Sequence, residues 1–442
     1  MSDKRTFFST RLGVLAATVG SAVGLGNIWR FPYEAGTHGG GAFLLCYIFF
    51  VFLIGVPVIC SEFAMGRRSR TGIPGAFQHL NKGRSGWNWI GWIGIAGAVM
   101  IISFYSVVAG WTLEYTIDSA VGMFSDHVQH NRHAEFLAFT QGWKPSLWVV
   151  VFMGINGLVL LGGVQKGIER VSNILMPLLF LILLAFCINS LLLPGAGEGL
   201  RFLFNPDFSQ LTPTVILGAM GQAFFSLSLG MGCMITYASY FKDDTPLMKT
   251  SIQIATLDTL VAILSGVIIF PAVFSFGMSP AEGPTLVFEV LPNIFQQMSG
   301  GRIWSTLFFL LLAVASLTSL ISVSEIAIAF FVDHLKMKRH MATLTLTLVG
   351  TILGVLCALS FGPLKNLDLF NAFDYISSNI LLPLGGMSTS IFAGWVMKRS
   401  TLYAELQGKG KLPRAAGEAI VISLRWIAPA CVLAVFIAGL MI

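Results

Sequence analysis

Long apolar stretches alternate with short polar ones along the whole chain. About eleven stretches each hold the roughly 20 mainly apolar residues that a helix needs to cross the hydrocarbon core of a membrane. They lie at about 11–36, 41–66, 88–119, 147–163, 168–193, 213–240, 247–277, 303–335, 341–361, 368–397 and 415–440. The pattern predicts an all-α integral membrane protein with about eleven transmembrane helices.

Composition excludes a soluble enzyme. Of the 442 residues, 55% are apolar and 11% are charged, whereas soluble domains have roughly 45–50% and 25%. No sizeable aqueous domain fits, and the formal net charge of +6 concerns membrane orientation and not nucleic-acid binding. The six cysteines lie in apolar stretches without a CxxC pair, so we interpret them as small apolar side chains.

Positive charges set the expected orientation. The N-terminal sequence MSDKRTFFSTRLG is short and basic and lacks a cleavage site, so we expect it to be retained. If it is cytoplasmic, Lys and Arg in the inner loops outnumber those in the outer loops by about four to one. The positive-inside rule then places the N-terminus inside and the C-terminus outside.

Two of the apolar stretches do not suit continuous helices. The first contains GSAVGLGN and the sixth contains SLSLGMG, each near its middle. Glycine weakens a helix interior by up to about 1 kcal/mol per residue. We therefore expect both helices to break near the bilayer midplane, where free backbone must line a polar cavity. The alternative is that these glycines only allow close packing of helices.

The distance between the two interrupted stretches predicts an internal repeat. They are five helices apart, and a half with an odd number of helices must be inverted relative to its partner. A single domain over 1–442 would contain repeats at about 11–193 and 213–397 and an extra helix at about 415–440. Inverted repeats with discontinuous helices are typical of secondary transporters.

Three segments carry a family resemblance. They read RLGVLAATVGSAVGLGNIWRFPYEAGTHGGGAF, GQAFFSLSLGMGCMITYASY and ASLTSLISVSEIAIAFFVDHL. They resemble helices 1, 6 and 8 of the neurotransmitter:sodium symporter family, in its bacterial amino-acid branch, and the resemblance runs over essentially the whole chain. We expect the twelfth helix seen in many members to be missing here. The resemblance implies a multi-pass protein of the bacterial cytoplasmic (inner) membrane.

The resemblance also implies a substrate site at the two breaks. Freed amides at Leu25 and Gly26 would hold a carboxylate at the start of a half-helix, where the helix dipole favours an anion. Gly24 replaces the aspartate of monoamine carriers, which favours an intact amino acid. Met231 is a flexible side chain and favours bulky aliphatic or aromatic substrates. The implied contact residues are Ala22, Leu25, Gly26, Ile101, Tyr105, Phe225, Ser226, Ser228, Met231, Ser319 and Val323.

Two sodium sites follow from the same resemblance, and no organic cofactor is expected. Oxygen ligands suit a hard cation such as sodium. The first site would use Ala22, Asn27, Ser226, Asp258 and the substrate carboxylate, and the second would use Gly20, Val23, Ala315, Thr318 and Ser319. The alternative for Thr318 and Ser319 is hydrogen bonding to the preceding turn of their own helix.

Asp258 is an acidic residue within a membrane span, which is expensive and therefore a functional candidate. Most of the family has asparagine there, and chloride-dependent members recruit an anion through residues that match Tyr47, Gln222 and Ser226. Some chloride-independent relatives place a glutamate at the position of Ala262. We expect Asp258 to supply the negative charge, which would make transport independent of chloride; a purely structural acid is the alternative.

Charged pairs above and below the breaks resemble gates. Arg30 and Asp374 match the outer pair, whereas Arg5 and Asp333, with Ser239 and Tyr240, match the inner latch. Exposed pairs of this kind are worth about 0–1 kcal/mol, which allows them to open. Glu62, inside the second span, is expected to brace the break in the first helix. The three-residue spacing of His127, His130 and His133 would allow a metal site on a helix, but we interpret the segment as a solvated polar loop.

The sequence thus predicts sodium-coupled uptake of a hydrophobic or aromatic L-amino acid by alternating access. The partners would be a small amino acid and the lipid bilayer, without nucleic acid. A channel would need a continuous polar pore, whereas the polar residues here cluster at mid-membrane, with charged pairs above and below. An intramembrane hydrolase would need motifs such as HExxH or GxSxG, which do not occur. A non-transporting amino-acid receptor on the same scaffold is the remaining alternative.

Overall fold

The fold is all-helical over the residues that the structure, a computed structural model, describes: 6–81, 85–123, 131–277, 286–407 and 413–441. Within these ranges, nine helices are long and apolar enough to cross a membrane. One further span consists of Arg11–Ala22 and Gly26–Thr37, two helices bent by 53° at a short break. The prediction of an all-α membrane protein is confirmed.

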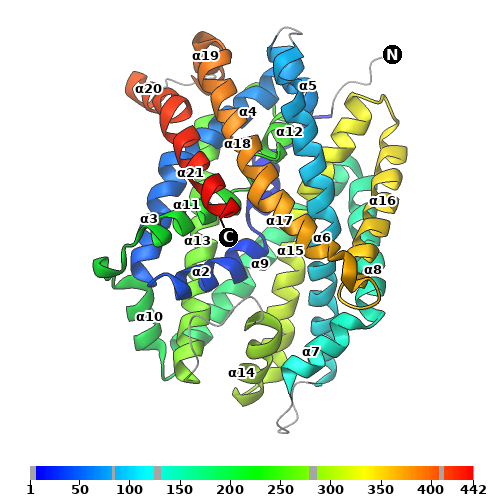
Figure 1. Ribbon diagram of the computed structural model, residues 1–442, viewed down its shortest axis with the longest axis vertical. Helices are drawn as coiled ribbons and strands as arrows, with labels where there is room; N and C mark the ends of the chain where they lie inside the picture. The colour runs from blue at the N-terminus through cyan, green and yellow to red at the C-terminus, as the bar shows by residue number, and fades with distance from the viewer. Residues whose placement is uncertain (1–5, 82–84, 124–130, 278–285, 408–412, 442) are drawn as a thin grey trace.

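The membrane-crossing helices run along the long axis of the molecule (Figure 1). Several of these spans consist of two α-helical pieces joined by a π-helical turn, and each α-helical piece has its own label. Their bounds are α1 Arg11–Ala22, α2 Phe31–Thr37, α3 Gly41–Phe50, α4 Val56–Ser69, α6 Asn88–Val121, α8 Lys144–Leu161, α9 Arg170–Leu191, α11 Pro213–Ser226, α12 Cys233–Ala238, α13 Leu247–Ser275, α15 Gly301–Asp333, α16 Arg339–Leu359, α17 Leu369–Tyr375, α18 Leu382–Ile391, α20 Arg414–Ile422 and α21 Ala428–Leu440.

Short helices cover the two ends of the bundle. The end that carries α5 (Ile73–Leu80) and α19 (Arg399–Gln407) also carries the start of the described chain (Figure 1). The opposite end carries α7 (Arg132–Gln141), α10 (Ala196–Phe204) and α14 (Leu291–Gln297). We call these the inner and the outer end, following the orientation that the charge distribution predicts.

The sixth predicted span is interrupted. Helices α11 and α12 have 14 and 6 residues, so at 1.5 Å per residue they extend only about 21 Å and 9 Å and neither crosses a membrane alone. Between them, Gly230 and Gly232 have φ angles of +87° and +84°, and Ser228 has +52°. Left-handed backbone is natural for glycine, so these residues end the helix. Together with the bent first span, this accounts for the number of spans predicted.

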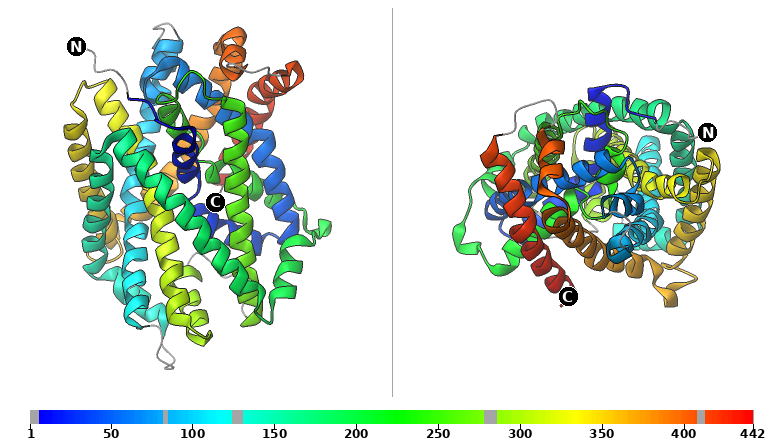
Figure 2. Two further views of the ribbon diagram at one scale, coloured as in Figure 1. Left: turned by 180° about the vertical axis from the view of Figure 1, so that it is seen from behind. Right: turned by 90° about the horizontal axis from the view of Figure 1, so that it is seen from above.

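Burial separates central from peripheral helices. The apolar windows of α6, α13 and α15 are 72% buried within the protein, whereas those of α8 and α16 are 39% buried and the last span is 33% buried. Helix α1 packs against α15, α9 and α13, and Figure 2 shows it beside α13 when the molecule is seen from behind. The first broken helix therefore packs against two of the best-buried helices, α13 and α15, and against the more peripheral α9.

Candidate functional site

The two breaks contact each other. The Ser228 hydroxyl donates a hydrogen bond of 2.9 Å to the carbonyl oxygen of Ser21, the penultimate residue of α1. The Asn27 side chain, just beyond the first break, donates to the Ser226 hydroxyl at 2.9 Å. Both contacts join residues about 200 positions apart, so the fold brings the two glycine-rich motifs together.

A cavity of about 50 Å³ lies between the breaks. Every residue that the sequence predicts to contact a substrate lines it. Its walls are Ala22, Gly24, Leu25, Gly26, Ile101, Phe104, Tyr105, Phe225, Ser226, Ser228, Met231, Ser319, Val323, Ser378 and Leu382. No wall residue is charged, although Arg30 lies nearby, so the cavity suits a ligand with an apolar side chain.

The prediction missed three of these wall residues. Phe104 follows Ile101 by nearly one turn of α6, and Ser378 lies one turn after Asp374. Their positions on the helices were a usable signal, because residues three and four apart share a helix face. Leu382 has no such mark in the sequence.

At the first break, two backbone amides donate hydrogen bonds to side-chain oxygens. The amide of Leu25 donates to the Tyr105 hydroxyl at 3.3 Å, and the amide of Gly24 donates to the Asn27 side-chain oxygen at 3.1 Å. A Cβ atom at Gly24 would lie 3.1 Å from the Tyr105 hydroxyl and 3.3 Å from Ser319. Glycine therefore keeps free the space beside the start of the second half-helix.

Asp258 lies at the centre of a buried polar cluster and is fully shielded from solvent. One carboxylate oxygen accepts hydrogen bonds from Ser226 at 2.6 Å and Tyr47 at 3.1 Å. The other accepts from Asn27 at 2.8 Å. Gln222, one turn before Ser226, donates to the carbonyl oxygen of Gly26 at 3.0 Å. Three predicted spans thus contribute donors to one carboxylate, which reduces the cost of burying it.

Thr318 lies against the end of the first half-helix. A Cβ atom at Gly20 would lie 3.2 Å from Cβ of Thr318. The Thr318 hydroxyl donates to the Ala315 carbonyl oxygen at 3.1 Å and to that of Val314 at 3.3 Å. This is the hydrogen bonding within one helix that was the alternative to a sodium site. It occupies the hydroxyl proton and leaves oxygen lone pairs that a cation could use.

Arg30 and Asp374, both described, do not form a direct ion pair. The Arg30 guanidinium lies 4.3 Å from the centre of the Phe225 ring and pairs with Glu34 at 3.6 Å. Asp374 accepts a hydrogen bond from Ser378 at 3.0 Å, although the Arg30 charge acts on it electrostatically. The outer pair is therefore separated, and Arg30 covers the ring of a cavity residue.

The predicted inner latch lies only partly within the described residues, because Arg5 is outside them. Asp333 accepts a hydrogen bond from the amide of Gly72 at 2.7 Å. The Ser239 hydroxyl bonds to its own helix, at Thr236. Pairing of Arg5 with Asp333 therefore stays a prediction.

Tyr240 belongs to a network that the sequence did not indicate. Its hydroxyl donates to Glu325 at 2.7 Å, and Arg339 contacts the same carboxylate through two bonds of 2.8 Å and 2.7 Å. The Glu325 side chain is fully buried, so this bidentate pair supplies its compensating charge. An acidic residue inside the span at 303–335 was the usable signal.

The first described residues of the chain are anchored at the inner end. Phe8 is buried among the rings of Tyr237, Tyr240 and Phe241 at centroid distances of 6.0–6.3 Å. The next two residues, Ser9 and Thr10, donate four hydrogen bonds of 2.5–3.0 Å to one carboxylate. That carboxylate belongs to Glu169, which the sequence analysis also missed.

The expected role of Glu62 was wrong in one respect. Glu62 accepts a hydrogen bond of 3.0 Å from the amide of Gly230, so it braces the break in the sixth span and not the break in the first. The reason is that α4, which carries Glu62, packs against α12. Hydropathy alone does not reveal which helices are neighbours.

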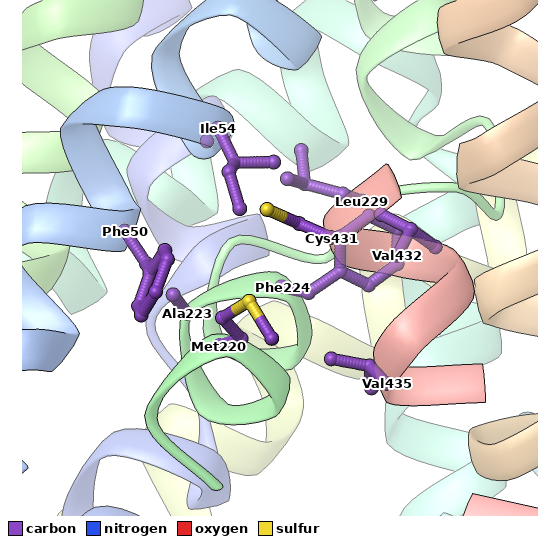
Figure 3. Close-up of a pocket in the computed structure, with 10 residues that line it drawn as sticks. Phe50, Ile54, Met220, Ala223, Phe224, Leu229, Cys431, Val432 and Val435 are labelled. Atoms are coloured by element: carbon purple, nitrogen blue, oxygen red, sulfur yellow. The ribbon is translucent and has the colours of Figure 1, made fainter. Parts of the chain in front are cut away.

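Two remaining features lie apart from this site. A separate void of about 10 Å³ lies between α3, α11 and α21. Figure 3 shows its lining of apolar side chains and Cys431. Of the three loop histidines, His127 and His130 lie outside the described residues, and His133 pairs with Glu289 at 3.0 Å. Among described residues, no cluster of His, Cys, Asp and Glu could hold a metal ion.

Known proteins resemble this chain along nearly its whole length. A family model described as "Sodium:neurotransmitter symporter family" matches residues 5–134 and 139–442. The sodium-dependent transporter YhdH of Bacillus subtilis (strain 168) is 40% identical over 444 residues, covering 99% of this chain and 98% of the relative. A sodium-dependent transporter of Haemophilus influenzae is 37% identical, covering 90% of each.

A solved structure confirms the fold. The crystal structure of MhsT in complex with L-phenylalanine is 43% identical in sequence, covers 98% of this chain and all of the other, and superposes with a TM-score of 0.90. The family that the sequence resembles, including its bacterial branch, is therefore confirmed. This chain belongs to the sodium:neurotransmitter symporter family.

Proposed function

We propose that the protein carries a hydrophobic or aromatic L-amino acid into the cell together with sodium. The observation that carries this proposal is the uncharged cavity enclosed by the two broken helices. Membership of a sodium-dependent transporter family supports it, as does the likeness to a structure that holds L-phenylalanine. The activity is transport and not enzymatic catalysis.

In this proposal the substrate carboxylate faces the start of the second half of helix 1. The amides of Leu25 and Gly26 and the Tyr105 hydroxyl would donate to it, helped by the helix dipole. The ammonium would face carbonyl oxygens of Ala22, Phe225 and Ser226 and the Ser228 hydroxyl. The remaining cavity wall is uncharged and mainly apolar, although serines contribute to it, so it would accept an apolar side chain and exclude charged ones.

Two sodium ions would accompany the substrate. The first would lie at Ala22, Asn27, Ser226 and Asp258 and also contact the substrate carboxylate. The second would lie at Gly20, Val23, Ala315, Thr318 and Ser319. Oxygen-rich surroundings fit a hard cation, and the buried Asp258 carboxylate would balance part of the charge. With that charge built in, transport would not require chloride.

Alternating access would then act on one fixed site. Arg30 and Asp374 would close the outer side, and Asp333, Tyr240, Ser239 and Arg5 would close the inner side. The two repeats, at about 11–193 and 213–397, would form the moving halves of one domain in the bacterial inner membrane, with the N-terminus in the cytoplasm. Sodium would favour the outward-open form to the extent that it binds that form more tightly.

Uptake into proteoliposomes tests the proposal. An inward sodium gradient should drive saturable accumulation of labelled L-phenylalanine, L-tyrosine or L-leucine above the external concentration, and replacing external sodium by choline should abolish it. Binding without accumulation would favour a receptor. Sodium-independent, non-saturating equilibration would favour a channel and overturn the proposal.

A further inference from the structure

Glu34, which lies outside the cavity, pairs with Arg30, the arginine that lies over the ring of the cavity residue Phe225. Glu34 lies one turn after Arg30, and the two side chains pair at 3.6 Å. Asp374, the other candidate partner of Arg30, is not paired with it directly and accepts instead from Ser378. Because one guanidinium cannot serve both acids fully, Glu34 competes with Asp374 for Arg30.

Glu34 has a second cationic partner one turn further along. Nδ1 of His38 lies 3.3 Å from its carboxylate and 2.9 Å from its backbone carbonyl oxygen. The imidazole ring stacks on Phe43, with the ring centres 5.7 Å apart. The side chains of Arg30, Glu34 and His38 are 34%, 17% and 20% exposed, so solvent only partly screens their charges.

The outer half of the sixth span adjoins this arrangement. A Cβ atom at Gly218 of α11 would lie 3.4 Å from Cε1 of His38 and 3.7 Å from the Glu34 carboxylate. Helix α11 ends at Ser226, next to Phe225, over which the Arg30 guanidinium lies. The Glu34–His38 pair thus belongs to the outer half of the first broken helix and faces the outer half of the sixth span.

We propose that Glu34 is a positioning residue for the outer gate and that protonation of His38 releases Arg30 from it. This inference rests on the proposed function, since it takes Arg30 as a gate over a transported amino acid. When His38 is neutral, Glu34 holds Arg30 away from Asp374. When His38 is charged, it neutralises Glu34, and Arg30 can move toward Asp374 and close over the substrate.

The sign of the pH effect follows from His38. Its hydrogen bond with Glu34 raises the pKa of His38 above its ordinary value, which is about 6.5. Among the described charged groups, Glu34 is the one whose charge acts on His38. His38 therefore becomes protonated at a higher external pH than an ordinary histidine, and mild acid should favour the closed outer gate.

The test is the half-saturating concentration of L-phenylalanine for uptake into proteoliposomes, at saturating sodium and fixed internal pH. External pH is varied between about 5.5 and 8.5, a range that extends to both sides of the ordinary pKa of histidine, with more room above it. For the unmodified protein, the half-saturating concentration should fall by roughly two- to fivefold toward low pH, as expected for a partly exposed ion pair.

The two key variants should both lose this dependence but at different levels. His38→Gln should stay at the high value that the unmodified protein has at high pH, because Glu34 keeps Arg30. Glu34→Gln should stay at the low value, because Arg30 is always released. His340→Gln removes an exposed histidine at the inner end and should keep the unmodified profile. The half-saturating concentration does not depend on how much protein folds, so its level can be compared between variants.

Other outcomes separate the two claims. If both variants keep the pH profile of the unmodified protein, or both shift to the same level, Glu34 does not position Arg30 and the inference is overturned. If the unmodified protein shows no sodium-dependent uptake at any pH, the proposed function fails first and the inference falls with it.

Discussion

At the scale of single residues, Asp258 concentrates the polar chemistry of the site. Donors from three spans converge on its carboxylate within 3.1 Å, and it has no contact with solvent. Such an arrangement stabilises a charged acid in a membrane interior. Whether the charge serves sodium and replaces chloride is a question that one substitution answers.

Asp258→Asn should weaken sodium activation of uptake by about tenfold or more, because a buried cation would lose its main counter-charge. Added chloride should partly restore the variant and leave the unmodified protein unchanged. The measurement is the sodium concentration for half-maximal uptake, with chloride or gluconate as the anion. Asp368→Asn, at an exposed outer position, is the matched control. Chloride stimulation of the unmodified protein would refute the assignment.

Gly24 sets the substrate class in this account. Gly24→Asp should place a carboxylate where the substrate carboxylate would bind, so binding of L-tyrosine should fall by about tenfold or more while tyramine, which lacks a carboxylate, should gain affinity. Competition against a labelled substrate measures both. Gly221→Ala is the control, because its Cβ would have only an ordinary contact at 3.6 Å, with Val435. Equal loss of both ligands would argue for a steric effect alone.

At the scale of elements, the second break is built into the backbone. Gly230 has a φ of +87°, its amide is held by Glu62 at 3.0 Å, and a Cβ there would lie 2.4 Å from the carbonyl oxygen of Leu382. A side chain at this position meets both an unfavourable backbone conformation and another helix. The backbone conformation and the close packing at Gly230 therefore build the break into the fold.

Gly230→Ala should destabilise the protein by about 1–3 kcal/mol or more, the usual cost of a strained backbone position. Thermal unfolding in detergent, followed by loss of the monodisperse species, measures this as a lower melting temperature. Gly221→Ala on the neighbouring helix should change it little. A Gly230→Ala variant with unchanged melting temperature would show that the local backbone relaxes without cost.

At the scale of the whole molecule, the sequence was sufficient to predict those features of the fold that depend on local composition. The spans follow from hydropathy, and the two breaks follow from glycines that a helix interior disfavours. Contacts between distant helices were not predictable in this way. The buried Glu325–Arg339 pair, the Glu169 cradle for Ser9 and Thr10, and the partner of Glu62 all depend on which helix faces which. Tertiary packing decides which helices are neighbours, and the spacing of residues along the chain does not indicate it.

The central claim is that both broken helices together hold an amino acid beside sodium. An experimental structure of the protein, purified with sodium and L-phenylalanine, tests this most directly. We expect ligand density between Gly24 and Ser228, with the carboxylate bonded to the Gly26 amide and the Tyr105 hydroxyl. We also expect an ion between that carboxylate and Asp258. Ligand bound elsewhere, or a carboxylate pointing away from the first break, would contradict the account.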